Sequence, residues 1–289
     1  MTTTQQDVAI SCSDNVSISG TIYHSSLPLK GAVMIAPATG IKQVFYAKFA
    51  MFLAQQGFGV ITYDNRGIGK SLTGDIKKSS ASLQCWGQQD QTAVLDRLMS
   101  EFPSTSYHLV GHSAGGQLVG LMPNSHNLTS IFNFACSSGC LKNMHFPYVF
   151  KALFFMNLFI PASNLIFGHA KSQWVGMGEP LPKQVAKQWQ HWCNGQGYVK
   201  TAFGKTIFEH HYDELDVPSL WLNAEDDDIA NNTNVADMIS VFTKAKHRAQ
   251  TQVLSPESYS VEDIGHMKFF SSQRKQLWPI AINWLTKHS

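Results

Sequence analysis

A chain of 289 residues, 44% of them hydrophobic, is long enough to bury one large core within a single α/β domain. Its formal net charge of +2 is too small for a nucleic-acid-binding surface, and its basic residues do not cluster. Five cysteines, an odd number spread along the chain, argue against a disulfide framework and favour free thiols. The N-terminal residues lack the basic and apolar regions of a secretory signal, so we expect a cytoplasmic protein.

The N-terminal part of the chain predicts the start of a sheet. Short alternating segments between Val8 and Tyr23 are separated by turn residues, as in antiparallel strands. The continuous apolar run 32–36 is typical of a strand buried on both faces, and the loop Pro37-Ala38-Thr39-Gly40 follows it. In a parallel sheet, a loop at this end of a strand faces the ligand crevice.

Helical and extended patterns then alternate. Amphipathic helices are predicted at 44–56 and 86–99, and apolar strands at 58–63, 107–110 and 131–135. This alternation predicts an α/β fold with a mostly parallel, doubly wound sheet and helices on both faces. The polar loop 64–71 lacks the spacing of a phosphate-binding motif, so we interpret it as a structural loop stabilised by Asp64 and Arg66.

The strongest chemical signal lies in the strand–turn–helix pattern of residues 107–118. Gly111-His112-Ser113-Ala114-Gly115 has the form G-x-S-x-G, in which the serine occupies a strained corner and the glycines avoid clashes. The Ser113 hydroxyl would be exposed above the sheet, and the N–H of Ala114 would be free to donate to an oxyanion. The alternative is a glycine-rich turn that only packs. We expect His112 to support the turn rather than to act as the base.

The second oxyanion donor is expected from the loop that follows the strand 32–36. Ala38 and Thr39 are both candidates, and for each the alternative is an ordinary loop residue.

A change in composition after residue 140 predicts an insertion. Phe, Leu and Ile dominate residues 146–167, with Lys151 and Pro161 as interruptions, and no strand–helix alternation resumes before Val217. The uninterrupted apolar stretch is shorter than about 18 residues, so we expect no stable membrane insertion.

The predicted organisation is an α/β core in two parts, 1–140 and 215–289, with a helical cap or lid at 141–214. Large apolar side chains of the cap would line a pocket for an apolar part of a substrate, or would attach the cap to the core.

Candidates for the acid and the base lie after the insertion. The strand 217–223 leads into Glu225-Asp226-Asp227-Asp228, and Asp227 fits best as an acid at the end of a strand, with Asp226 as the alternative. A lone histidine is more often structural, but His266 completes the order serine, acid, histidine with Ser113 and Asp227. An amphipathic helix is predicted at 273–287.

The segment Glu209-His210-His211-Tyr212-Asp213 lacks the ligand spacing of a metal site, so we expect no metal and no cofactor.

The chain resembles α/β-hydrolases of the serine-aminopeptidase-like branch, in particular a group of bacterial predicted hydrolases of unassigned substrate. The matching segments are 36–40, 64–69, 111–116, 178–182, 226–227 and 264–266. This resemblance implies the α/β-hydrolase fold and a Ser–His–Asp triad acting on a small-molecule acyl substrate. The sequence departs from the commoner pattern because it lacks His-Gly in the Ala38 loop, which leaves the second oxyanion donor open. Whether the chain forms a homodimer is also left open.

Three functions are compatible with these patterns. The first is a serine hydrolase that cleaves an ester or similar acyl bond. The second is an aminopeptidase or amidase, which needs an acidic anchor for the substrate amine, and Glu179 in the cap would have to supply it. The third is a binding protein that retains the fold without catalysis.

Overall fold

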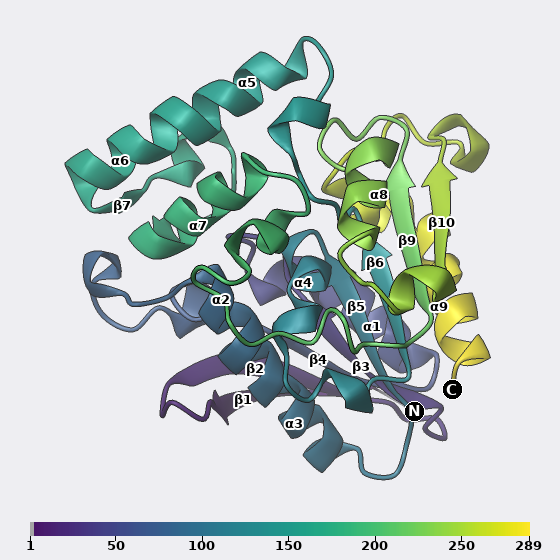
Figure 1. The fold of residues 1–289 in the computed structure, drawn as a ribbon. Helices are drawn as coiled ribbons and strands as arrows, with labels where there is room; N and C mark the ends of the chain where they lie inside the picture. The colour runs from purple at the N-terminus through teal and green to yellow at the C-terminus, as the bar shows by residue number, and fades with distance from the viewer. Residues whose placement is uncertain (1–2) are drawn as a thin grey trace.

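The computed structural model describes residues 3–289 and is organised around one large sheet. Its eight strands run in the order β1-β2-β4-β3-β5-β6-β9-β10 (Figure 1). The strands are β1 (Thr4–Ser11), β2 (Ser17–His24), β3 (Gly31–Ala36), β4 (Phe58–Tyr63), β5 (Tyr107–His112), β6 (Ser130–Phe134), β9 (Ser219–Ala224) and β10 (Ala249–Leu254). Strand β2 pairs antiparallel with β1 and β4, and the other pairs are parallel. The predicted mostly parallel α/β sheet is therefore confirmed.

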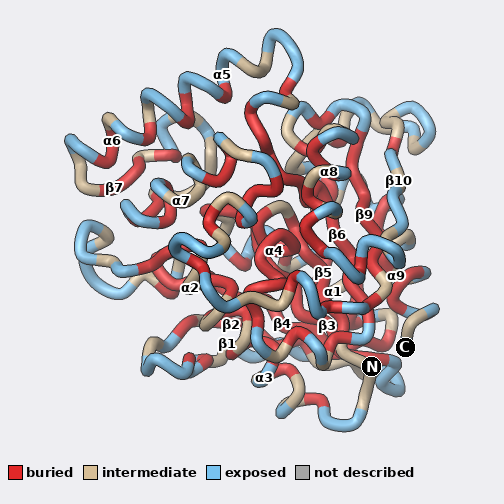
Figure 2. The backbone as a smooth tube through the Cα atoms, in the orientation of Figure 1, coloured by how far each residue is buried: buried red, intermediate tan, exposed pale blue. Residues whose placement is uncertain are grey.

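The central strands are apolar along their whole length because both of their faces are covered. Every residue of β3, β4, β6 and β9 is buried, whereas the residues of the edge strand β10 are exposed or partly buried except for its last residue, Leu254. Figure 2 shows this buried centre.

The helices of the core lie in the connections between these strands and, in the case of the last helix, after the final strand. They are α1 (Ala47–Gln55), α2 (Leu83–Cys85), α3 (Thr92–Glu101), α4 (Ala114–Gln117), α8 (Asn232–Ile239) and α9 (Trp278–Lys287). The rings of Phe49 in α1 and Trp278 in α9 are in edge contact, so these two helices lie side by side. The sequence predicts the last helix from residue 273, but residues 272–277 form a kinked 3-10 segment and the α-helix begins at Trp278, with Pro279 in its first turn.

A largely helical segment separates β6 from β9. It contains α5 (Tyr148–Phe154), a π-helical turn (Phe155–Phe159), α6 (Ile160–Phe167), β7 (His169–Ala170), β8 (Leu181–Pro182) and α7 (Lys183–Cys193). In Figure 1 these elements lie on the side of the sheet toward which β9 points. We call this segment the cap.

The long helix of the cap differs from the sequence-based expectation. Lys151 and Pro161 interrupt the apolar sequence, yet helical structure runs without a break from Tyr148 to Phe167, over a length of 20 residues. The π-helical turn precedes Pro161, and such a turn accommodates a residue that lacks a backbone N–H. By length and composition this helix is apolar enough to cross a membrane, with a mean hydropathy of 1.6. The absence of membrane insertion stays a prediction.

Candidate active site

The turn between β5 and α4 holds Ser113 in a strained backbone conformation. Its φ of 48° and ψ of −118° lie in a region that residues other than glycine rarely adopt. The strain is held in place because the Ser113 N–H donates to the Phe134 carbonyl, at 3.0 Å, while the Ser113 carbonyl accepts from Gly116 and Gln117, both at 3.2 Å. The serine therefore stands at a fixed corner at the end of β5.

The glycines around Ser113 are dictated by close backbone approach, as the motif predicts. A Cβ at Gly115 would lie 2.0 Å from the Ala36 carbonyl oxygen, and a Cβ at Gly111 would lie 2.5 Å from the Gly116 nitrogen. Gly116 is equally constrained, because its Cβ would lie 2.1 Å from the Asn133 side-chain oxygen. No side chain fits at these three positions without moving β3, α4 or the Asn133 side chain of β6.

The structure brings Ser113, His266 and Asp227 together from three distant parts of the chain. His266 Nε2 lies 3.1 Å from Ser113 Oγ, and His266 Nδ1 lies 2.9 Å from Asp227 Oδ2. The Asp227 side chain is fully buried, whereas that of His266 is 17% exposed. One imidazole thus contacts a hydroxyl through one nitrogen and a carboxylate through the other, which is the arrangement that activates a serine for nucleophilic attack.

Asp227 is held as a carboxylate in spite of its burial. Burial alone raises the pKa of Asp227, but the charge and the hydrogen bond of His266 outweigh that effect, and the net pKa is lowered. Its Oδ1 also accepts the N–H groups of Ile229 and Ala230, each at 2.9 Å. These backbone donors fix the carboxylate toward the imidazole.

Asp226, the alternative acid, has a different partner. Its two oxygens accept the N–H groups of Ile264 and Gly265, at 2.8 and 2.9 Å, and so hold the loop that carries His266. Asp227 therefore contacts the imidazole of His266, and Asp226 holds the backbone of the loop that carries it.

His112 is part of a hydrogen-bonded chain that links the base to the loop after β3. It is fully buried, and burial lowers the pKa of His112 to about 3, so the ring is neutral. Its Nε2–H donates to the His266 carbonyl at 2.9 Å, because a carbonyl can only accept. Its Nδ1 then accepts from the Tyr46 hydroxyl at 2.8 Å, and the Tyr46 oxygen accepts the Ala38 N–H at 2.9 Å.

These hydrogen bonds distinguish the two candidates for the second oxyanion donor, Ala38 and Thr39. The Ala38 N–H is engaged by Tyr46, whereas within residues 3–289 no hydrogen-bond partner is found for the N–H of Thr39. Both residues line the cavity beside Ser113. Ala114 is the first residue of α4, where a helix offers its N–H no internal acceptor.

A cavity of about 430 Å³ opens between Ser113 and the cap. Most of its lining is apolar and comes from the cap, including Met144, Ala152, Phe155, Met156 and Trp189. Among the described residues that line it, none is an aspartate or glutamate. The triad serine thus faces a space suited to an apolar group.

Glu179 is turned away from this cavity. Its carboxylate pairs with Lys42 at 2.9 Å, and its N–H donates to the Gly40 carbonyl at 2.8 Å. These contacts join the cap to the loop after β3.

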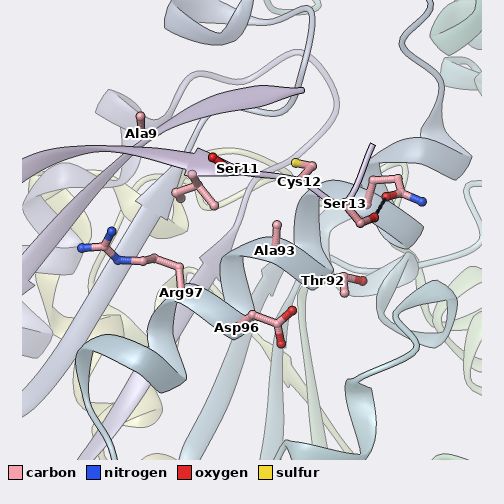
Figure 3. Close-up of a pocket in the computed structure, with 10 residues that line it drawn as sticks. Ala9, Ser11, Cys12, Ser13, Thr92, Ala93, Asp96 and Arg97 are labelled. Atoms are coloured by element: carbon pink, nitrogen blue, oxygen red, sulfur yellow. Dashed lines mark hydrogen bonds between the residues drawn. The ribbon is translucent and has the colours of Figure 1, made fainter. Parts of the chain in front are cut away.

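A second hollow, of about 470 Å³, lies between the end of β1 and α3 and shares no lining residue with the cavity at Ser113 (Figure 3). Its one thiol, Cys12, is buried, and burial raises the pKa of Cys12 to about 12. The surrounding Ser11, Thr92 and Asp96 form no nucleophile–base pair, so this hollow offers no comparable chemistry.

Two participants in the site were not identified from the sequence. Tyr46 reads as one apolar position of a helix, and nothing in its spacing indicates a hydrogen bond to His112. The sequence indicates Asp226 only as the alternative acid and gives no sign of its hydrogen bonds to the His266 loop.

Comparisons with known proteins identify the family and the fold of the chain. Residues 27–259 match the family model described as serine aminopeptidase, S33. A search among proteins of curated function finds no match.

Similar solved structures cover nearly the whole chain. A carboxyl esterase from Bacillus coagulans superposes with a TM-score of 0.65 at 13% identity, covering 100% of this chain and 99% of that one. An esterase from Pyrococcus furiosus gives 0.62 at 14% identity, with 99% and 92% covered. A monoacylglycerol lipase from Paleococcus ferrophilus gives 0.61 at 14% identity, with 94% and 99% covered. At these identities the likeness shows a common fold.

Proposed function

We propose that this chain, which belongs to the serine aminopeptidase S33 family of α/β-hydrolases, is a serine hydrolase that cleaves carboxylic esters with an apolar acyl group. The observation that carries the proposal is the contact of Ser113 with His266 and of His266 with Asp227, at the floor of an apolar cavity. The small-molecule acyl ester is the only partner that the reaction needs besides water.

In the proposed reaction, His266 Nε2 accepts the Ser113 proton while Oγ attacks the carbonyl carbon of the ester. Asp227 holds the ring with Nδ1–H toward the carboxylate and stabilises the imidazolium that forms. Collapse of the tetrahedral intermediate breaks the bond to the alcohol oxygen, which receives the proton from His266. The acyl group is then bound to Ser113 Oγ. A water molecule gives a proton to His266 Nε2 while its oxygen attacks the acyl carbon, and cleavage of the bond between that carbon and Oγ releases the acid as His266 returns the proton to Ser113.

The oxyanion would be held by two backbone N–H groups. We assign the first donor to Ala114, at the start of α4, and the second to Thr39, because the Ala38 N–H is already engaged by Tyr46. Ala38 would take this role only if the Tyr46 contact broke on substrate binding.

Ester cleavage is favoured over aminopeptidase activity by the charges around the cavity. An aminopeptidase must balance the charged α-amine of its substrate, and the carboxylate expected to do so, that of Glu179, is paired with Lys42 outside the cavity. The names of the similar structures, two esterases and a monoacylglycerol lipase, agree with this choice.

The test compares p-nitrophenyl esters with aminoacyl p-nitroanilides, using the parent chain and Ser113→Ala. We expect hydrolysis of the esters, and we expect Ser113→Ala to lose at least about 10³-fold in kcat together with labelling by a fluorophosphonate. A preference for the anilides would assign the aminopeptidase function instead. Labelling that persists in Ser113→Ala would remove this serine from its role, and inertness to every substrate and to the fluorophosphonate would indicate a binding protein.

A further inference from the structure

The outer side of the cap carries an unusual concentration of exposed apolar side chains. Of the 14 large hydrophobic residues exposed within residues 3–289, eight lie between residues 146 and 174. Leu165 is 86% exposed, Phe150 63% and Leu158 60%. Monomeric soluble proteins seldom gather such side chains in one place unless something covers them.

These side chains form a stripe along one helix. Phe150, Phe154, Leu158, Pro161 and Leu165 are exposed and recur every three or four residues, which places them on one face. The opposite face, with Ala152, Met156, Ile160 and Ser163, is buried against the rest of the cap. Figure 2 shows the exposed positions along the outer edge of α5 and α6. We call this outer stripe, together with Ile166 and Trp174, the cap face.

The charged side chains of the cap segment that carries this face have one sign. Residues 141–178 contain Lys142, Lys151 and Lys171 and no aspartate or glutamate. Lys171 Nζ lies 4.4 Å from the ring centroids of both Phe167 and Trp174, so a cation and two aromatic rings are clustered at the end of α6. Lysine and tryptophan beside an apolar stripe are typical of helices that lie in a membrane interface.

The cap face is continuous with the entrance of the cavity. Phe154 is 53% exposed on the cap face and also lines the cavity, and Tyr148 and Lys151 of the same helix line the cavity too. A surface that covered this face would therefore meet the route to Ser113.

We propose that the cap face docks on an anionic lipid surface, with the helix Tyr148–Phe167 lying in the plane of the interface. A second copy of the chain is a poorer occupant. A two-fold symmetric contact through this face would bring the lysines of both copies together, and residues 141–178 supply no carboxylate to pair with them. Anionic head groups supply the missing negative charge, and acyl chains cover the apolar stripe.

The proposal is tested by flotation with vesicles of phosphatidylcholine alone and of phosphatidylcholine mixed with phosphatidylglycerol. The experiment uses the Ser113→Ala chain, so that binding is measured whether or not the protein is an esterase. We expect binding to the mixed vesicles, with a partition coefficient lowered at least about tenfold in Phe150→Ser/Leu158→Ser/Leu165→Ser. None of these three side chains lines the cavity.

Two controls separate docking from damage to the fold. Phe208→Ser removes an exposed ring outside the cap face, 76% exposed, and should bind like the parent. The triple variant, made with Ser113 intact, should retain the parent's fluorophosphonate labelling or, if the parent is not labelled, its urea unfolding midpoint. Lys142→Gln/Lys171→Gln should lower binding to mixed vesicles and leave the weaker binding to phosphatidylcholine unchanged.

Three results would overturn the proposal. The first is that the Ser113→Ala chain does not bind the mixed vesicles, and the second is that it binds them no better than the triple variant does. The third is that the chain binds no vesicles but forms a concentration-dependent dimer, which the triple substitution abolishes. The last result would assign the cap face to a second copy.

Discussion

Replacing Asp227 by asparagine tests the central contact of the site. The carboxylate accepts from His266 Nδ1 at 2.9 Å and from two backbone N–H groups, each also at 2.9 Å. An asparagine side chain has one acceptor oxygen. The N–H groups of Ile229 and Ala230 donate to Oδ1 and would therefore hold that oxygen at the Oδ1 position. The amide nitrogen would then face Nδ1 and favour the tautomer with hydrogen on Nε2, which cannot accept the Ser113 proton.

The expected loss in kcat for Asp227→Asn is about 10⁴-fold, or about 5 kcal/mol in activation free energy. Asp226→Asn is the matched control, because it makes the same chemical change at the next residue. It removes one of two hydrogen bonds to the His266 loop, at 2.8 and 2.9 Å, worth about 1.5 kcal/mol, and the expected loss is about tenfold.

The assay is hydrolysis of p-nitrophenyl butyrate, with urea unfolding of each variant to show that the fold is kept. Equal losses in the two variants, or a larger loss in Asp226→Asn, would refute the assignment of Asp227 to the imidazole.

Two further predictions concern buried groups. The folded pKa of His112 is about 3 against an ordinary value of 6.5, so between these values the unfolded chain binds a proton that the folded chain excludes, and stability falls as pH falls. His112→Gln should therefore reduce the pH dependence of the unfolding free energy by about 1.4 kcal/mol per pH unit between about pH 4 and 6, measured by urea titration, and an unchanged slope would contradict a neutral imidazole. Ala152→Phe should place a ring in the cavity of about 430 Å³ and lower kcat/KM for octanoyl esters at least about tenfold while changing acetyl esters less than about twofold, since each methylene that loses apolar contact costs about 0.8 kcal/mol. A uniform loss for both esters would argue that the acyl chain lies elsewhere.

The sequence predicts those parts of the fold in which only one kind of residue fits the local structure. Gly111 and Gly115 are read correctly because backbone atoms of β3 and α4 occupy the space of any side chain there. The buried strands are read correctly because a strand covered on both faces must be apolar throughout. Ser113 and the loop of His266 follow the parallel strands β5 and β10, and parallel pairing brings the carboxyl ends of these strands to one edge of the sheet.

The parts that the sequence does not predict depend on contacts across long distances in the chain. Whether Asp226 or Asp227 contacts the imidazole depends on how the loop of His266 packs against the end of β9. The sequence around the two aspartates does not indicate that packing. The sequence predicts a helical cap but not the length of its long helix, because Pro161 normally ends a helix and the π-helical turn before it has no clear sequence signature.

The neutral state of His112 explains why a histidine suits this position of the turn. The ring must donate to the His266 carbonyl and accept from the Tyr46 hydroxyl, and only a neutral imidazole does both. A protonated ring would donate through both nitrogens, so the Tyr46 hydroxyl would lose its acceptor and its oxygen would have to serve the imidazolium as well as the Ala38 N–H. Since the loop of Ala38 carries the proposed oxyanion donor Thr39, protonation of this one buried ring would disturb the base and the oxyanion site together. Histidine thus serves at position 112 as a connector that burial keeps neutral, whereas at position 266 the proposed reaction needs it to carry a proton.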